Sequence, residues 1–110
     1  MNLNEYLMNQ YDVDDPDIGN HFRLPLAKRI ECADGFSISV QANYAAYCSP
    51  RTNIGPWSSV ECGFPSSDPS EIIGKGECPD RPTETVYGYV PIKLVEKLID
   101  SHGGYLQKSD

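Results

Sequence analysis

The chain has 110 residues, of which 39% are hydrophobic, 10% aromatic and 23% charged, a composition typical of one folded domain with a single modest core. Sixteen acidic against nine basic residues give a net charge of −7, which argues against direct nucleic-acid binding. No apolar run approaches the ~20 residues of a membrane span, and the N-terminus lacks the features of a secretion signal. We therefore expect a cytoplasmic protein without membrane contact.

Residues 1–17 predict a short helix followed by an acidic loop. Over residues 2–11 the apolar spacing is helical, and Asn2 or Asn4 can cap the first turn. The apolar face of this helix would carry Leu3, Tyr6, Leu7 and Tyr11.

The acidic run that follows contains Asp12, Asp14, Asp15 and Asp17 beside Pro16, and this composition predicts an exposed loop. One interpretation is a solvated linker. A second is a patch directed at a basic partner, and on this interpretation the four aspartates are candidate contacts. A calcium loop would need the ligand spacing and the Glu of an EF-hand, and both are absent.

Two segments with period-two alternation, Lys28–Cys32 and Phe36–Ala42, flank the tripeptide Ala33-Asp34-Gly35. Asp-Gly between alternating segments is a strong signal for a tight turn. We expect a β-hairpin that buries one face.

Residues 44–57 predict a stiff loop, because Pro50 and Gly55-Pro56 restrict the backbone near its two ends. Residues 57–64 predict a third strand. We expect its more apolar set to face the core, and its other set to lie on the open face of the sheet. The core set is Ser58, Val60, Cys62 and Phe64, and the open set is Trp57, Ser59, Glu61 and Gly63.

The C-terminal half predicts a long polar loop, a strand and a helix. Residues 66–82 would wrap the surface, with only Ile72 and Ile73 as anchors. Residues 83–90 predict the fourth strand, with two tyrosines on one face. Residues 91–102 predict the C-terminal helix, which Pro91 would begin and Gly103-Gly104 would end. The two strand faces are Val86, Gly88 and Val90, against Tyr87 and Tyr89; the apolar stripe of the helix is Ile92, Leu94, Val95, Leu98 and Ile99.

The four cysteines are far apart in sequence, without a C-x-x-C pair, and we expect reduced, buried thiols. Zinc bound by four Cys, or by three with His21 or His102, would need closer ligand spacing. The string CSPR around Cys48 does not match protease signatures, and a Cys–His pair would need spatial adjacency. His102 is most simply a helix-end residue. We therefore expect no catalytic residue, metal or cofactor. The cysteines are Cys32, Cys48, Cys62 and Cys78.

Four residues of the central stretch complete the candidate contacts: Tyr47, Arg51, Trp57 and Glu61. A guanidinium held beside a rigid turn can grip a carboxylate or phosphate. The alternative is an ion pair of Arg51 with Glu61 across the sheet. Tyr and Trp are common at interface hot spots and equally common in a thin core.

Between about Ser39 and Gly104 the strings SVQA, CSPR, GPW, GFPS, VYGYVP and HGG occur in order. In these strings the chain resembles a group of small uncharacterised proteins of tailed bacteriophages and prophages. The resemblance implies a genomic setting in which small acidic proteins act as host-takeover or counter-defence factors. Anti-CRISPR proteins are one such class, and this step is an analogy.

Together these observations predict one α+β domain spanning residues 1–110. We expect an antiparallel sheet of about four strands, with the C-terminal helix on one face and the N-terminal helix at an edge. The expected function is non-enzymatic: a phage accessory protein that binds and inhibits a host protein with a basic surface, such as a nucleic-acid-handling defence complex, in the cytoplasm of an infected bacterium.

Two alternatives remain open at this point. One is a small-ligand protein that binds a nucleotide signal in a pocket of Tyr47, Arg51, Trp57 and Tyr89. The other is a minor virion component. The oligomeric state is also open, a homodimer included.

Overall fold

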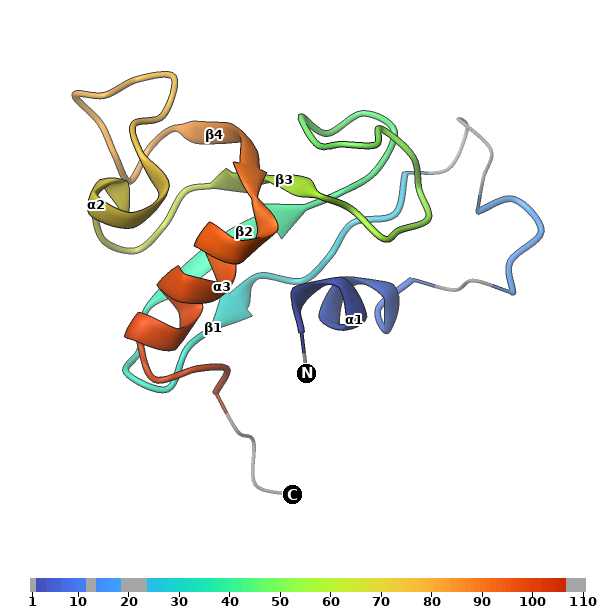
Figure 1. The fold of residues 1–110 in the computed structure, drawn as a ribbon, viewed down its shortest axis with the longest axis horizontal. Helices are drawn as coiled ribbons and strands as arrows, with labels where there is room; N and C mark the ends of the chain where they lie inside the picture. Colours follow the sequence, from blue (N-terminus) through green and yellow to red (C-terminus); the bar gives the residue numbers. More distant parts are fainter. Residues whose placement is uncertain (1, 12–13, 19–23, 107–110) are drawn as a thin grey trace.

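The structure, a computed structural model, describes residues 2–11, 14–18 and 24–106. It confirms the α+β class: a four-stranded antiparallel sheet in the order β1-β2-β3-β4 carries the C-terminal helix, with a short N-terminal helix beside it (Figure 1). The elements are α1 (Leu3–Met8), β1 (Ile30–Glu31), β2 (Ser37–Gln41), β3 (Ser59–Gly63), α2 (Ser70–Ile73), β4 (Val86–Pro91) and α3 (Ile92–Ser101).

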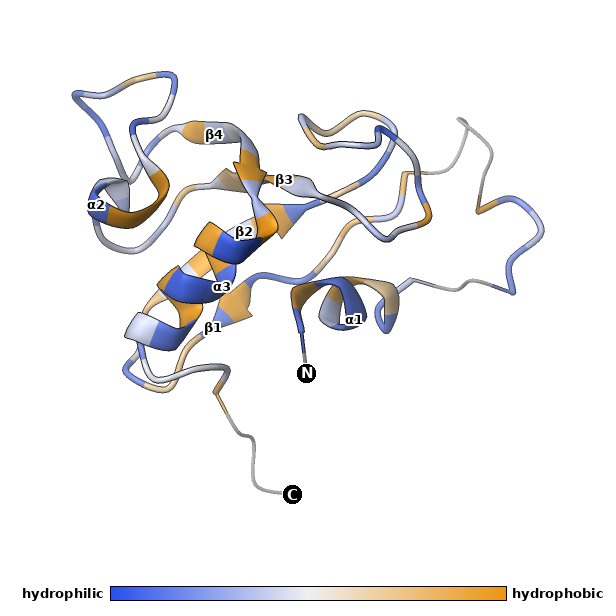
Figure 2. Cartoon of the chain, viewed as in Figure 1, coloured by the Kyte–Doolittle hydropathy of each residue, from blue (hydrophilic) through white to orange (hydrophobic). Residues whose placement is uncertain are grey.

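The core lies between the sheet and α3, and α1 closes one end of it. Figure 2 shows α3 striped with apolar and polar residues, as the sequence spacing predicts. Burial of each such aliphatic side chain contributes roughly 1.5–3 kcal/mol. The most deeply buried residues include Leu3 and Leu7 of α1, Val40 of β2, Val60 and Cys62 of β3, and Val95, Leu98 and Ile99 of α3.

Helix α1 is too short to persist alone, and three polar contacts hold it. The side chain of Asn2 accepts a 2.9 Å hydrogen bond from the Glu5 N–H, which confirms one of the two predicted caps. The Leu3 N–H donates to a Glu96 carboxylate oxygen on α3 at 3.0 Å. The Asn4 side chain bonds both the N–H and the carbonyl of Trp57.

The predicted hairpin is confirmed, with shorter strands. Ile30 pairs with Ile38, and Gly35 occupies the left-handed region at φ +97°. This conformation explains why the turn uses glycine. The turn also meets the end of α3, because the Asp34 N–H donates to the His102 carbonyl at 3.2 Å.

The fourth strand contains a β-bulge that the alternation in the sequence does not reveal. Cys62 pairs with Tyr87, whereas Val60 pairs with Val90, so β4 holds one extra residue opposite this part of β3. The expectation that Tyr87 and Tyr89 share a face is therefore wrong. Tyr87 is buried, and Tyr89 is exposed at φ +53°.

Phe64, which we expected in the core, is 53% exposed. Its φ of +49° turns the side chain away from the face that the β2–β3 register would give it. Arg29 holds this conformation, since its guanidinium donates to the carbonyls of Ser37 and Phe64.

Residues 66–82 contain the short helix α2, which the sequence did not predict. Its Ile73 is buried and Ile72 is partly buried, as expected of the two anchors, and α2 contacts α3. Pro91 closes β4 and occupies the N-cap position of α3, so the helix begins one residue later than the sequence predicts. Across the described ranges, no helix combines the length and the apolar character needed to cross a membrane.

Candidate partner-binding surface

Two exposed tyrosines stack on each other at the edge of the sheet. The ring centres of Tyr47 and Tyr89 are 6.0 Å apart, with 25° between the ring planes. The side chains are 42% and 50% exposed. The guanidinium carbon of Arg51 lies 5.9 Å from the centre of the Tyr47 ring, a cation–π contact. Glu61 accepts a hydrogen bond from the Tyr47 N–H, and we call the four residues Tyr47, Arg51, Glu61 and Tyr89 the tyrosine platform.

The bulge in β4 builds the platform. It directs the Tyr89 N–H to the Tyr47 carbonyl at 2.8 Å. The Tyr47 N–H in turn donates to a Glu61 carboxylate oxygen at 2.9 Å. Gly88 allows a close approach beside them, because a Cβ at that position would lie only 3.1 Å from the Tyr47 Cβ. The two rings are therefore fixed by backbone contacts rather than by their own packing alone.

The structure excludes one of the two sequence interpretations of Arg51 and Glu61. No ion pair joins these two residues, both of which belong to the described part of the chain. Glu61 instead accepts from the Tyr47 backbone, and Arg51 is exposed over the Tyr47 ring. The guanidinium is thus accessible to a partner.

Trp57 does not lie on the open face, and that prediction is wrong. The side chain is only 2% exposed, packs edge-on against Tyr11 at 6.0 Å, and donates from its indole N–H to the Thr52 carbonyl at 3.1 Å. Trp57 precedes β3, which begins at Ser59, so the strand alternation does not reach it. It is a core residue of the central loop and cannot meet a partner in this conformation.

Two buried asparagines, which sequence reasoning missed, order the central loop. The Asn43 side-chain oxygen accepts from the N–H groups of Ala45 and Ala46 at 2.9 and 2.8 Å. Asn53 accepts from the Tyr44 N–H at 2.9 Å and donates to the Ile18 carbonyl at 2.6 Å. Asn often accepts from the backbone N–H two residues on, as Asn43 does from Ala45, and this turn preference is the local signal that the sequence offers.

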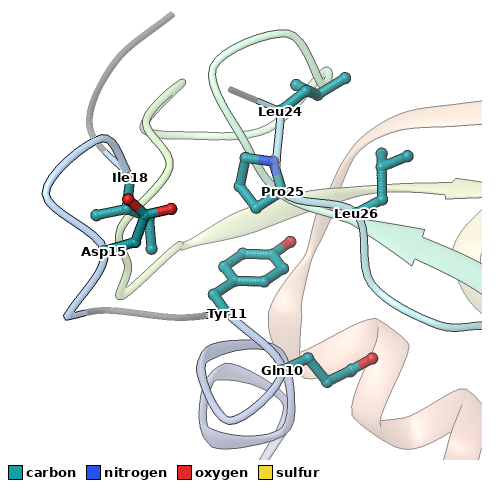
Figure 3. Close-up of a pocket in the computed structure, with 7 residues that line it drawn as sticks. All are labelled: Gln10, Tyr11, Asp15, Ile18, Leu24, Pro25 and Leu26. Carbon is teal, nitrogen blue, oxygen red and sulfur yellow. The ribbon is translucent and has the colours of Figure 1, made fainter. Parts of the chain in front are cut away.

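The acidic segment is connected to this loop through Ile18. Asp14 and Asp17 are exposed, and Asp15 is half-buried and accepts from the Asp17 N–H at 2.9 Å. The loop expected here is confirmed over residues 14–18; Asp12 and His21 lie outside the described residues. Asp15 and Ile18 also line a cavity of about 190 Å³ (Figure 3).

Cys32, Cys48 and Cys62 are buried, and burial raises the pKa of each thiol, that of Cys62 to about 12. The Cys48 thiol donates to the carbonyls of Asn43 and Pro50. Cys78 is exposed, which corrects the expectation of four buried thiols, because it lies in the polar loop before β4. Within residues 2–11, 14–18 and 24–106, no three His, Cys, Asp or Glu side chains are grouped to hold a metal ion.

His102 caps α3, as the sequence indicates. Its Nδ1 lies 2.7 Å from an Asp34 carboxylate oxygen, and its ring stacks on Phe36 with centres 3.9 Å apart. The Phe36 N–H, and then the His102 side chain, hold the pKa of Asp34 below its ordinary value. These contacts join the β1–β2 turn to the end of α3.

The predicted contact residues thus separate into three groups. Tyr47, Arg51 and Glu61 lie together, Asp14, Asp15 and Asp17 lie on an adjoining loop, and Trp57 is buried. Comparison with protein-family models, with curated proteins and with solved structures finds no match to this chain.

Proposed function

We propose that the protein is a non-enzymatic accessory protein of a bacteriophage or prophage that binds and inhibits a host protein. The target is a protein or complex with a basic surface, in the class of nucleic-acid-handling defence complexes, and binding occurs in the cytoplasm of the infected bacterium. The resemblance to small phage proteins supports the setting.

The observation that carries this proposal is the tyrosine platform. Tyr and Arg are the residue types most enriched at interface hot spots. Here Tyr47, Tyr89 and Arg51 are exposed together, and hydrogen bonds fix the backbone that presents them. A surface held in place before binding loses little conformational entropy when a partner docks.

The charge of the chain supports the choice of partner. The net charge of −7 would speed association with a basic surface through long-range attraction. The adjoining aspartates, Asp14, Asp15 and Asp17, concentrate part of this charge beside the central loop.

The state of the Cys48 thiol favours binding over catalysis at that residue. A cysteine nucleophile acts as the thiolate, and burial raises the pKa of the Cys48 thiol. His102, the described histidine, is stacked on Phe36 and bonded to Asp34 at the end of α3.

A capture experiment tests the proposal. The tagged chain is incubated with lysate of the bacterium whose phage or prophage encodes it, and bound proteins are quantified. We expect one host protein in stoichiometric amount. Replacing Asp14 and Asp17 by Lys should slow association, and the effect should fade as salt is added. The charge-matched control replaces Asp80 and Glu84 by Lys; both are exposed in the loop before β4.

Two further measurements distinguish the alternative functions, a ligand-binding protein and a virion component. A nucleotide or cyclic nucleotide that raises the melting temperature would support a ligand-binding protein. A symmetric oligomer at micromolar concentration, with no captured protein, would support a virion component.

A further inference from the structure

A groove beside the acidic segment combines an apolar floor with an acidic side. We call it the Tyr11 groove. Figure 3 shows the Tyr11 ring at its centre with Pro25 above it, Asp15 and Ile18 on one side, and Leu26 on the other. The groove has a volume of about 190 Å³ and is lined by Gln10, Tyr11, Asp15, Ile18, Leu24, Pro25 and Leu26.

Two leucines at this groove are exposed to solvent. Leu24 is 43% and Leu26 is 66% exposed, although each would gain free energy by leaving water. Single exposed apolar residues are ordinary, but two beside one groove form a patch, and such patches often mark contact sites.

Hydrogen bonds join the Tyr11 floor, Pro25 and Ile18 to the central loop and to the residue that follows β2. The Tyr11 hydroxyl donates to the Ala42 carbonyl at 2.9 Å. The Asn43 side chain donates to the Pro25 carbonyl at 3.1 Å, and the Asn53 side chain to the Ile18 carbonyl at 2.6 Å. The groove is therefore formed before any partner arrives, which lowers the entropic cost of binding.

The negative charge around the groove favours an apolar occupant that also carries a cation. Asp15 lines it, and the exposed Asp14 and Asp17 lie on the same loop. Lysine and arginine have an aliphatic stem and a cationic head. Such a side chain can lay its stem on the leucines and direct its head to the carboxylates, whereas an acidic segment would be repelled.

We propose that the Tyr11 groove binds a short segment of a basic partner protein in which an aliphatic residue stands next to a lysine or arginine. This inference rests on the proposed function and specifies the chemistry of the partner. The aliphatic residue contacts Leu24, Leu26 and Ile18, and the cation faces Asp15.

The test is an NMR titration of the full-length, isotope-labelled chain with three synthetic peptides of equal length. One alternates leucine with lysine, one leucine with glutamate, and one serine with lysine. We expect the leucine–lysine peptide to shift the amide resonances of Tyr11, Ile18 and Leu26, and to bind at least about fivefold more tightly than either comparator. Equal binding of the serine–lysine peptide would show attraction by charge alone and would overturn the inference.

Matched variants locate the contact. Leu26→Ser and Asp15→Asn should each weaken binding of the leucine–lysine peptide by about fivefold or more. Leu106→Ser and Glu77→Gln change an exposed leucine and an exposed acid elsewhere, and should leave it unchanged. If all four variants bind alike, or if the same resonances shift with protein concentration alone, the occupant is not a basic partner segment and the inference fails.

The two proposals can fail separately. If a stoichiometric host protein binds Leu26→Ser as tightly as the wild type, the inference about the Tyr11 groove is wrong and the proposed function still holds. If the peptide binds specifically but no host protein is captured, the proposed function is wrong and peptide binding in the Tyr11 groove still holds.

Discussion

The backbone N–H of Tyr89 donates a 2.8 Å hydrogen bond to the carbonyl of Tyr47, and the two rings stack at 6.0 Å. This bond joins the bulge of β4 to the loop between β2 and β3. It fixes an exposed pair of aromatic rings on a frame that the core supports, and the proposed function depends on this rigidity.

The left-handed backbone of Phe64 gives the first prediction. Phe64→Ala and Phe64→Gly both remove an exposed ring, but only glycine adopts φ near +49° without steric cost. We expect Phe64→Gly to be more stable than Phe64→Ala by about 1 kcal/mol, measured by urea unfolding.

The control pair is Lys97→Ala and Lys97→Gly, on the exposed face of α3. There the glycine variant should be the less stable by about 1 kcal/mol. A penalty for glycine at both positions would contradict the left-handed conformation of Phe64.

Two tyrosine hydroxyls provide a matched comparison. The Tyr105 hydroxyl is buried and has no hydrogen-bond partner among the described residues, whereas the Tyr11 hydroxyl donates to Ala42. We expect Tyr105→Phe to raise the free energy of unfolding by up to about 1 kcal/mol, and Tyr11→Phe to lower it by about 1 kcal/mol. Equal losses for the two variants would show that Tyr105 has a polar partner after all.

The thiols should differ sharply in reactivity. Cys78 is exposed, whereas Cys32, Cys48 and Cys62 are buried. With a thiol-specific disulfide reagent at pH 8, one thiol per chain should react rapidly. The other three should react at least about a hundredfold more slowly, because they require opening of the fold. Cys78→Ser should abolish the rapid phase; its persistence would mean that one of the three is accessible.

The Asp34 carboxylate, which accepts from the Phe36 N–H and contacts His102, predicts a pH dependence of stability. The folded state lowers the pKa of Asp34. The charged carboxylate therefore stabilises the fold at pH values above the ordinary pKa of an aspartate, about 3.9. This contribution is lost as the pH falls through the lowered value. Between pH 5 and pH 2 the urea midpoint of the wild type should therefore fall more than that of Asp34→Asn. Ser70 also lowers the pKa of Asp68, but this contribution to the pH dependence is the same in the wild type and in Asp34→Asn. Parallel curves would contradict the account.

The sequence predicted the elements that repeat a simple period. The alternation of β2 and the apolar stripe of α3 are single-period patterns, so their buried faces follow directly. The Asp-Gly turn has a local cause as well, since glycine alone readily adopts the positive φ found at Gly35.

The errors occur where the period is interrupted. The bulge in β4 separates Tyr87 from Tyr89, the left-handed Phe64 leaves the core face, and Trp57 lies before the strand begins. Only the bulge has a local signature, because an isolated glycine within a strand pattern, here Gly88, is a signal for a bulge. The same bulge forms the tyrosine platform. Sequence reasoning grouped Tyr89 with Tyr47 and Arg51 only in the alternative ligand pocket, which it also assigned to the buried Trp57.

The central claim is that the tyrosine platform is the contact with a host protein. The captured partner is purified, and its dissociation constant is measured by calorimetry for the wild type, Tyr89→Ala and Phe64→Ala. The two variants are matched, because each removes an exposed aromatic ring at a positive φ, Tyr89 in β4 and Phe64 directly after β3. We expect Tyr89→Ala to weaken binding by about tenfold or more and Phe64→Ala to match the wild type. Equal affinity for all three proteins would contradict the claim.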